Sequence, residues 1–225
     1  MAIGKHPGAG SRDAVVEALQ TSRGAARIEL DLPSAPRSLL VLGHGAGGGV
    51  DAVDLVAVRD ALLPARVAIA RLTQPYRVAG RRAPAPANHL DEAFVEAVTA
   101  LRADLPAVPL VVGGRSSGAR VACRTARALD ASGVLALAFP LHPPGKPEKS
   151  RLPELDTGLP TLVVNGDRDP FGVPPSSGTV RVVVRPGERH GLSVDPAGVA
   201  AVVRDWFAER GWSRPRRRAP ARRDV

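Results

Sequence analysis

Residues 109–130 read PLVVGGRSSGARVACRTARALD, and their pattern indicates the fold class. Its first six residues are almost continuously apolar, as in a strand that is buried on both faces. Residues 117–130 follow a helical period, and their inward face is formed by Val121, Ala122, Ala126 and Leu129. A short turn, GRSSG (114–118), joins the two segments. A buried strand followed directly by an amphipathic helix predicts a parallel sheet that is covered by helices.

The same alternation continues along the chain in both directions. Residues 28–32 are predicted as an edge strand, and further apolar strands are predicted at 38–43, 65–70, 134–139, 161–166 and 179–184. Helices are predicted at 51–62, around 90–101, and from Asp195 to Gly211. We therefore expect an α/β fold with a mostly parallel, doubly wound sheet and helices on both faces.

The two ends of the chain differ from this core. The first residues are rich in Gly and Ala, and the last residues consist mainly of Arg and Pro, which have nothing to bury. We expect three parts: a peripheral segment at 1–24 with a short helix around 12–20, one domain at 25–212, and a disordered tail at 213–225.

The net charge of +9 is concentrated in that tail. Residues 213–225 hold six Arg and one Asp, so five of the nine excess positive charges lie there. The rest of the chain is only mildly basic, which by itself is no argument for a polyanionic partner. We expect no nucleic-acid partner, and only weak binding of an acidic partner by the tail.

Several classes of protein are excluded by composition. A single cysteine, Cys123, rules out a disulfide framework and a zinc site made of cysteines alone. No stretch approaches the roughly 18 apolar residues of a membrane span, and residues 1–14 lack the apolar segment of a signal peptide. We expect a cytoplasmic protein without a membrane partner, a metal or a cofactor.

Ligands of such sheets bind at the carboxyl ends of the strands, and the turn at 114–118 lies at one of them. GRSSG fits the pattern G-x-S-x-G, in which a strained turn lifts a serine hydroxyl clear of the sheet. The frame selects Ser116 as a nucleophile, with Gly114 and Gly118 supplying the space for the turn. The alternative for Ser116 is a plain helix N-cap.

Two later turns carry the groups that would activate such a serine. The turn NGDRDP (165–170) offers two carboxylates, Asp167 and Asp169, either of which could orient an imidazole. Of the five histidines, only His190 follows a strand and also comes after these acids. The order Ser, Asp, His on successive strand-end turns is that of a hydrolase triad.

A glycine run after the strand at 38–43 permits two interpretations. GHGAGG (43–48) fits the dinucleotide fingerprint G-x-G-x-x-G, and Arg71 after the next strand would then suit only a 2′-phosphate. The other interpretation is an oxyanion hole, in which the backbone N–H groups of Ala46 and Ser117 face a developing negative oxygen. His44, Gly45 and Gly47 would support this loop. We favour the oxyanion hole, because it also explains Ser116 and His190.

Two loop regions give expectations about the charge of the substrate and the shape of its pocket. Arg77, Arg81, Arg82 and Lys146 form a candidate basic rim for an acidic acyl substrate, although solvated loop cations are the more ordinary interpretation. Residues 140–159 occupy the usual place of a lid but are only 20 residues long and include five prolines. We expect no cap domain and an open, shallow pocket.

Six motifs together resemble a small α/β-hydrolase-like family. They are GHGAGGGVD, QPYRVAGRRAPA, GGRSSGARVA, FPLHPPGKPEK, NGDRDPFG and ERHGL. The family includes testis-expressed protein 30 and the subunit 3 domain of the non-specific-lethal chromatin complex, and dienelactone hydrolase-type enzymes are more distantly similar. The resemblance covers roughly residues 25–210. It implies an α/β-hydrolase core with Ser116 as nucleophile, Asp169 as acid and His190 as base.

These observations favour a serine hydrolase of the esterase or thioesterase type, which cleaves a small acyl substrate through an acyl-enzyme. The resemblance also implies an alternative, because some members of that family look like scaffolds: a non-catalytic α/β-hydrolase-like interaction module. An NADP-dependent reductase is a distant third hypothesis, because it rests on the glycine run alone.

Overall fold

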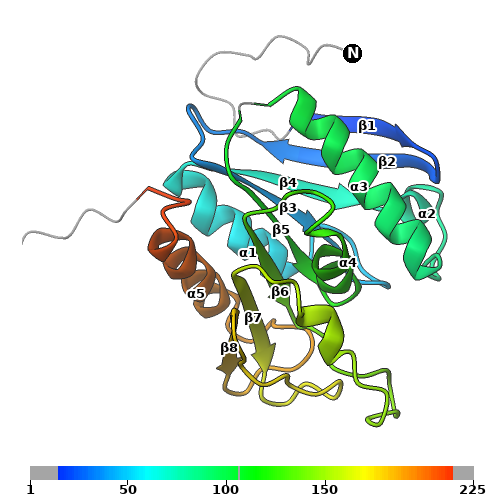
Figure 1. Cartoon of the computed structure of the whole chain (residues 1–225), viewed down its shortest axis with the longest axis vertical. Coiled ribbons are helices and arrows are strands. Elements are labelled where there is room, and N and C mark those ends of the chain that lie inside the picture. The colour runs from blue at the N-terminus through cyan, green and yellow to red at the C-terminus, as the bar shows by residue number, and fades with distance from the viewer. Residues whose placement is uncertain (1–14, 106, 215–225) are drawn as a thin grey trace, which may run out of the picture.

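The computed structural model describes residues 15–105 and 107–214 (Figure 1). Within these residues, eight strands form a single sheet in the order β1-β2-β4-β3-β5-β6-β7-β8. The strands are β1 (Val15–Thr21), β2 (Gly24–Asp31), β3 (Ser38–Gly43), β4 (Val67–Thr73), β5 (Leu110–Arg115), β6 (Gly133–Leu137), β7 (Thr161–Gly166) and β8 (Val180–Arg185). β4, β3 and β5 to β8 are parallel, whereas β2 runs antiparallel to both β1 and β4.

Helices cover both faces of this sheet, as the apolar strands predicted (Figure 1). The helices are α1 (Val53–Leu62), α2 (Pro75–Val78), α3 (Ala87–Ala103), α4 (Ser117–Thr125) and α5 (Pro196–Glu209), with 3₁₀ turns η1 (Leu63–Ala65) and η2 (Leu152–Leu155). Alternate residues of β3 serve the two faces. Leu39 and Val41 pack with α3 and α4, whereas Leu40 and Leu42 pack with α1 and α5. The predicted doubly wound α/β fold is confirmed.

The amino-terminal part departs from the prediction. The described part of the segment expected as a helix around 12–20 is strand β1, which pairs with β2 through a tight turn at Ser22 and Arg23. Its side chains alternate between exposed and half-buried positions, a period of two that suits a strand at the rim of a sheet. Because β1 covers β2, residues 28–32 are an inner strand and not the predicted edge.

The last helix begins and ends where the sequence indicates. The Asp195 carboxylate caps α5 by accepting the N–H of Gly198, Pro196 is the first helical residue, and Gly211 follows the helix with a positive φ of 72°. Trp212 then packs edge-on against Trp206, with their ring centroids 5.0 Å apart. Apart from Ser213 and Arg214, the predicted disordered tail at 213–225 lies outside the described residues.

The carboxyl ends of the parallel strands lie at one edge of the sheet. The connection at 140–159 contains only the short turn η2 and no cap domain, as predicted. None of the helices in the described ranges combines the length and the apolar character needed to cross a bilayer.

Candidate active site

The turn between β5 and α4 holds Ser116 in a strained conformation. Its φ and ψ are 52° and −109°, in a region that side chains other than glycine rarely adopt. The turn is tight because α4 starts against the end of β3: a Cβ on Gly118 would overlap the backbone carbonyl of Gly43, and a Cβ on Gly114 would also collide with it. Ser116 occupies the N-cap position, but its side chain makes no capping hydrogen bond.

The Ser116 hydroxyl faces His190 instead. Its Oγ lies 2.9 Å from Nε2 of His190, and Nδ1 of that ring lies 2.8 Å from Oδ2 of Asp169. A carboxylate only accepts hydrogen bonds, so Nδ1 carries the ring proton and Nε2 is free to accept the serine proton. The structure thus brings three of the predicted residues into one chain of hydrogen bonds from three different turns.

The two candidate aspartates lie in different environments. The side chain of Asp169 is fully buried, and its second oxygen, Oδ1, accepts the N–H of Phe171 at 2.9 Å. The Phe171 ring packs edge-on against His190, with the ring centroids 4.4 Å apart. Asp167 is exposed, and its carboxylate accepts the N–H of Gly187. Only Asp169 is therefore in contact with the imidazole.

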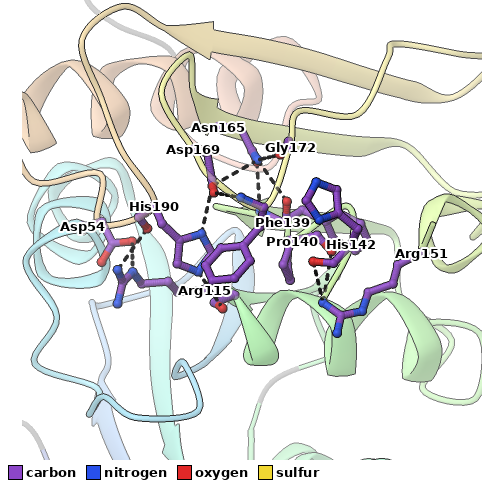
Figure 2. A network of polar contacts seen from close by, with 12 residues as sticks. Asp54, Arg115, Phe139, Pro140, His142, Arg151, Asn165, Asp169, Gly172 and His190 are labelled. Atoms are coloured by element: carbon purple, nitrogen blue, oxygen red, sulfur yellow. Dashed lines mark hydrogen bonds and ion pairs between the residues drawn. The ribbon is translucent and has the colours of Figure 1, made fainter. Parts of the chain in front are cut away.

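Asn165 lies next to Asp169 and supports it, a role that the sequence did not predict (Figure 2). Its side chain is completely buried; Oδ1 accepts the N–H of Phe139 at 2.8 Å, and Nδ2 donates to the carbonyls of Phe139 and Gly172. Nδ2 also lies 3.5 Å from Oδ2 of Asp169. The available signal was a lone amide at the end of an apolar strand, TLVVNG, which a core position would not otherwise retain.

The glycine loop lies beside the nucleophile. A Cβ on Gly45 would lie 3.7 Å from the Cβ of Ser116. His44 is buried and anchors the loop: its Nδ1 lies 2.8 Å from the Gly45 carbonyl, and its Nε2 accepts the N–H of Gln74. Burial lowers the pKa of His44, which keeps the ring neutral and suits these two contacts.

The two proposed oxyanion donors belong to these elements. Ala46 follows Gly45, and its carbonyl accepts the Tyr76 hydroxyl at 2.8 Å, which holds the loop from the side of α2. Ser117 is the first residue of α4, where backbone N–H groups have no partner within the helix. Gly47, by contrast, has open space around it, so that position needs no glycine for packing.

The candidate basic rim is dispersed. Arg81, Arg82 and Lys146 are exposed and Arg77 is half-exposed. Arg81 borders a hollow of about 480 Å³ beside α2, and Arg77 borders a separate hollow of about 340 Å³ beside the glycine loop. Ser116 and His190 line neither of them. The structure therefore does not gather these cations around the nucleophile.

The structure argues against the dinucleotide interpretation of the glycine run, because Arg71 is not free to bind a 2′-phosphate. Arg71 is buried, and its guanidinium lies 2.9 Å from Glu29 and 3.8 Å from Asp31, while it donates to the Val50 carbonyl. A side chain committed to two carboxylates in this way is not available to a 2′-phosphate. Among the described residues, no three His, Cys, Asp or Glu side chains are grouped to hold a metal ion.

A second pair of charged residues lies next to the serine and histidine. Arg115, the variable residue of the G-x-S-x-G turn, donates from Nη2 to the carbonyl of His190 at 3.0 Å, and its Nε lies 3.1 Å from the buried carboxylate of Asp54 (Figure 2). Burial raises the pKa of Asp54 from 3.8 to about 6. Neither side chain stands out in the sequence, because an unspecified motif position and an aspartate near a helix start are ordinary features.

Comparison with known families gives this geometry a context. A family model described as alpha/beta hydrolase domain matches residues 36–182, which is more than half of the chain. The chain belongs to the α/β hydrolase family. The match runs from β3 into β8 and includes Ser116 and Asp169, and His190 lies just beyond it.

Solved structures share the fold of this α/β hydrolase. A lidless α/β serine hydrolase from Xanthomonas campestris superposes with a TM-score of 0.73 at 20% identity, over 92% of this chain and 99% of that one. A dienelactone hydrolase from Anabaena variabilis gives 0.70 at 19% identity, over 88% and 99%. Esterase 2 of Thermogutta terrifontis, solved phosphorylated by paraoxon, gives 0.69 at 13% identity, over 91% and 96%. No curated protein matches the sequence significantly.

Proposed function

We propose that this α/β hydrolase is a serine esterase or thioesterase that cleaves small acyl substrates through an acyl-enzyme. The observation that carries the proposal is a pair of hydrogen bonds to the His190 ring. Nε2 lies 2.9 Å from Ser116 Oγ, and Nδ1 lies 2.8 Å from Oδ2 of Asp169. A strained serine between a strand and a helix is the second support. Both features are suited to nucleophilic attack by the Ser116 hydroxyl.

In the first half of the reaction, Ser116 Oγ attacks the acyl carbon while Nε2 of His190 takes the hydroxyl proton. Asp169 remains ionised, keeps the ring in the required tautomer and stabilises its positive charge. The carbonyl oxygen becomes an oxyanion, to which the N–H groups of Ala46 and Ser117 donate. The tetrahedral intermediate then collapses, and the leaving alkoxide or thiolate departs with the proton from Nε2.

The second half repeats these steps with water. A water molecule gives a proton to Nε2 and attacks the acyl-enzyme carbon, and the new intermediate releases the carboxylic acid. The proton returns to Ser116 Oγ, so the enzyme is regenerated. No cofactor or metal takes part in this scheme.

The remaining expectations stay predictions. They include the narrower kinship with the family of testis-expressed protein 30, the division into segments 1–24, 25–212 and 213–225, cytoplasmic location, and weak binding of an acidic partner by the tail. The basic rim of Arg77, Arg81, Arg82 and Lys146 also stays a prediction, and two of its members, Arg77 and Arg81, border hollows that Ser116 and His190 do not line.

A screen of short-chain p-nitrophenyl esters and acyl thioesters with purified protein tests the proposal. We expect turnover of at least one acetyl or butyryl substrate, and loss of that turnover in Ser116→Ala. A folded wild-type protein that hydrolyses none of them would favour the non-catalytic interaction module.

A further inference from the structure

The side chain of Arg115 ties together the parts of the site that must stay in register. Its Nη2 donates to the main-chain carbonyl of His190, and its Nη1 lies against the glycine loop, 3.8 Å from where a Cβ of Gly45 would be. Arg115 is itself the residue before Ser116. One guanidinium therefore links the nucleophile turn to the turn of the base (Figure 2). It also lies close to the loop of the proposed oxyanion hole.

Asp54 anchors this guanidinium from the interior. Its side chain is fully buried on α1, its Oδ1 accepts the N–H of Leu55, and its Oδ2 lies 3.1 Å from Nε of Arg115. Within the described ranges, Oδ2 has no hydrogen-bond partner and Arg115 is its ion-pair partner. Apolar residues of the same volume commonly give as much stability as a buried ion pair or more. A carboxylate kept here is thus better explained by what it holds than by stability.

The turn that Arg115 holds needs such an anchor. His190 must meet Ser116 on one side of its ring and Asp169 on the other, so a small displacement of its main chain breaks both contacts. Beyond it, Leu192 has a positive φ of 45°, and Glu188 secures the chain farther on by accepting the N–H of Val194. At His190 itself, the main-chain carbonyl is held by Arg115.

We propose that Arg115 is a positioning residue, which holds the His190 turn against the Ser116 turn and is itself held by Asp54. The inference rests on the proposed function, since positioning matters only where His190 serves as a base. The competing role for Arg115 is direct contact with an acidic substrate, because its side chain is 19% exposed.

Four variants separate these roles. Arg115→Met removes both contacts, Arg115→Lys keeps a charge for Asp54 but cannot bridge to the His190 carbonyl at the same time, and Asp54→Asn removes the anchor. Arg189→Met is the matched control: this arginine directly precedes His190, is exposed, and makes no side-chain hydrogen bond or ion pair with any described residue.

For hydrolysis of p-nitrophenyl acetate, we expect kcat to fall about ten-fold in Arg115→Met with KM nearly unchanged, because misplacement of a catalytic group slows the chemical step. Arg115→Lys should recover part of the loss. The double variant with Asp54→Asn should be no worse than Arg115→Met alone, since both act through one contact. Arg189→Met should match the wild type.

A rise in KM with an unchanged kcat would overturn positioning and indicate a substrate contact. A kcat of Arg115→Met equal to that of the control Arg189→Met would overturn positioning as well. Crystal structures of the wild type and Arg115→Met supply a readout that does not depend on activity: we expect the distance from Ser116 Oγ to His190 Nε2 to lengthen, and an unchanged distance would contradict the inference. If Arg115→Met does not fold, the same comparison with Arg115→Lys and Asp54→Asn decides it. A wild type without esterase activity would contradict the proposed function alone.

Discussion

At the scale of single residues, the surroundings of two aspartates decide which of them can act as the acid, although the sequence offers both. Asp167 and Asp169 differ by two positions, yet one accepts a backbone N–H at the surface and the other is buried against the imidazole. Pro170 contributes to this difference, because a residue before proline is restricted to extended conformations. Asp169 is thereby held where Phe171 and Asn165 satisfy its carboxylate.

This difference predicts unequal effects of two matched substitutions. Asp169→Asn should lower kcat on the order of 10⁴-fold, because an amide can donate to Nδ1 and favours the wrong histidine tautomer. Asp167→Asn should cost far less, through weaker hydrogen bonding in its turn. Steady-state kinetics on one short-chain ester, with melting temperatures measured in parallel, gives the comparison. The reverse ranking at equal stability would make Asp167 the acid.

Asp54 predicts a measurable effect of pH on stability. Its pKa is raised by burial from 3.8 to about 6, so the folded chain binds this proton more tightly than the unfolded chain. The stability that the bound proton contributes is complete below pH 3.8 and is lost as pH rises to about 6, a change of roughly 3 kcal/mol. Asp54→Asn does not titrate. The melting temperature of Asp54→Asn minus that of the wild type should therefore increase between pH 4 and pH 7. A difference that stays constant over this range would contradict the raised pKa of Asp54.

At the scale of elements, the site depends on how closely a strand, a loop and a helix approach one another. α4 starts against the carboxyl end of β3, which is why positions 114 and 118 hold glycine. The glycine loop after β3 is anchored by His44 below and by Tyr76 from α2. Burial raises the pKa of Tyr76, so its hydroxyl stays protonated and donates at neutral pH.

Removing that anchor predicts a selective loss of rate. Tyr76→Phe deletes the hydrogen bond to the Ala46 carbonyl and keeps the packing of the ring, at a cost of about 1 kcal/mol. If the bond acts mainly by holding the oxyanion loop, kcat should fall about five-fold. Kinetics and thermal unfolding of the same preparation test this. A loss of stability without a change in kcat would show that the loop is held by other contacts.

Elements with a local signal in their own sequence were predictable. Elements that form only because they pair or pack with another part of the chain were not. The turn at 114–118 and the start of α5 carry their own signals of glycine, aspartate and proline. β1 has no such signal: it is a strand because β2 lies beside it. The same reason applies to Asp54 and Arg115, which are distant in the sequence and form an ion pair only because the fold brings α1 and the end of β5 together at this point.

At the scale of the whole molecule, the candidate site lies at the carboxyl edge of the sheet, and the described residues include no cap domain over it. Ser116 and His190 line neither the hollow beside α2 nor the hollow beside the glycine loop, and a third hollow, which reaches Ser117, measures only about 10 Å³. A long acyl chain would lie largely in water, whereas each buried methylene contributes about 0.8 kcal/mol to binding.

The openness of the site predicts a preference for short acyl chains. p-Nitrophenyl acetate or butyrate should have a higher kcat/KM than the palmitate ester, because only the first few methylenes find an apolar surface. The measurement is kcat/KM for p-nitrophenyl esters of increasing acyl chain length. The soluble esters are assayed in one detergent-free buffer, and the longest ester is assayed in a matched emulsion. A clear preference for chains beyond ten carbons would reveal a hydrophobic tunnel and contradict the open pocket.

The most direct test of the account is the covalent labelling of one serine. A fluorophosphonate reacts only with an activated hydroxyl, so the wild type should gain one label, which peptide mass spectrometry should locate on Ser116. Ser117→Ala should keep the label, because only its backbone is used, and Ser116→Ala and His190→Ala should lose it. Full labelling of Ser116→Ala, or a label on another residue of the folded wild type, would contradict the assignment of Ser116 as the nucleophile.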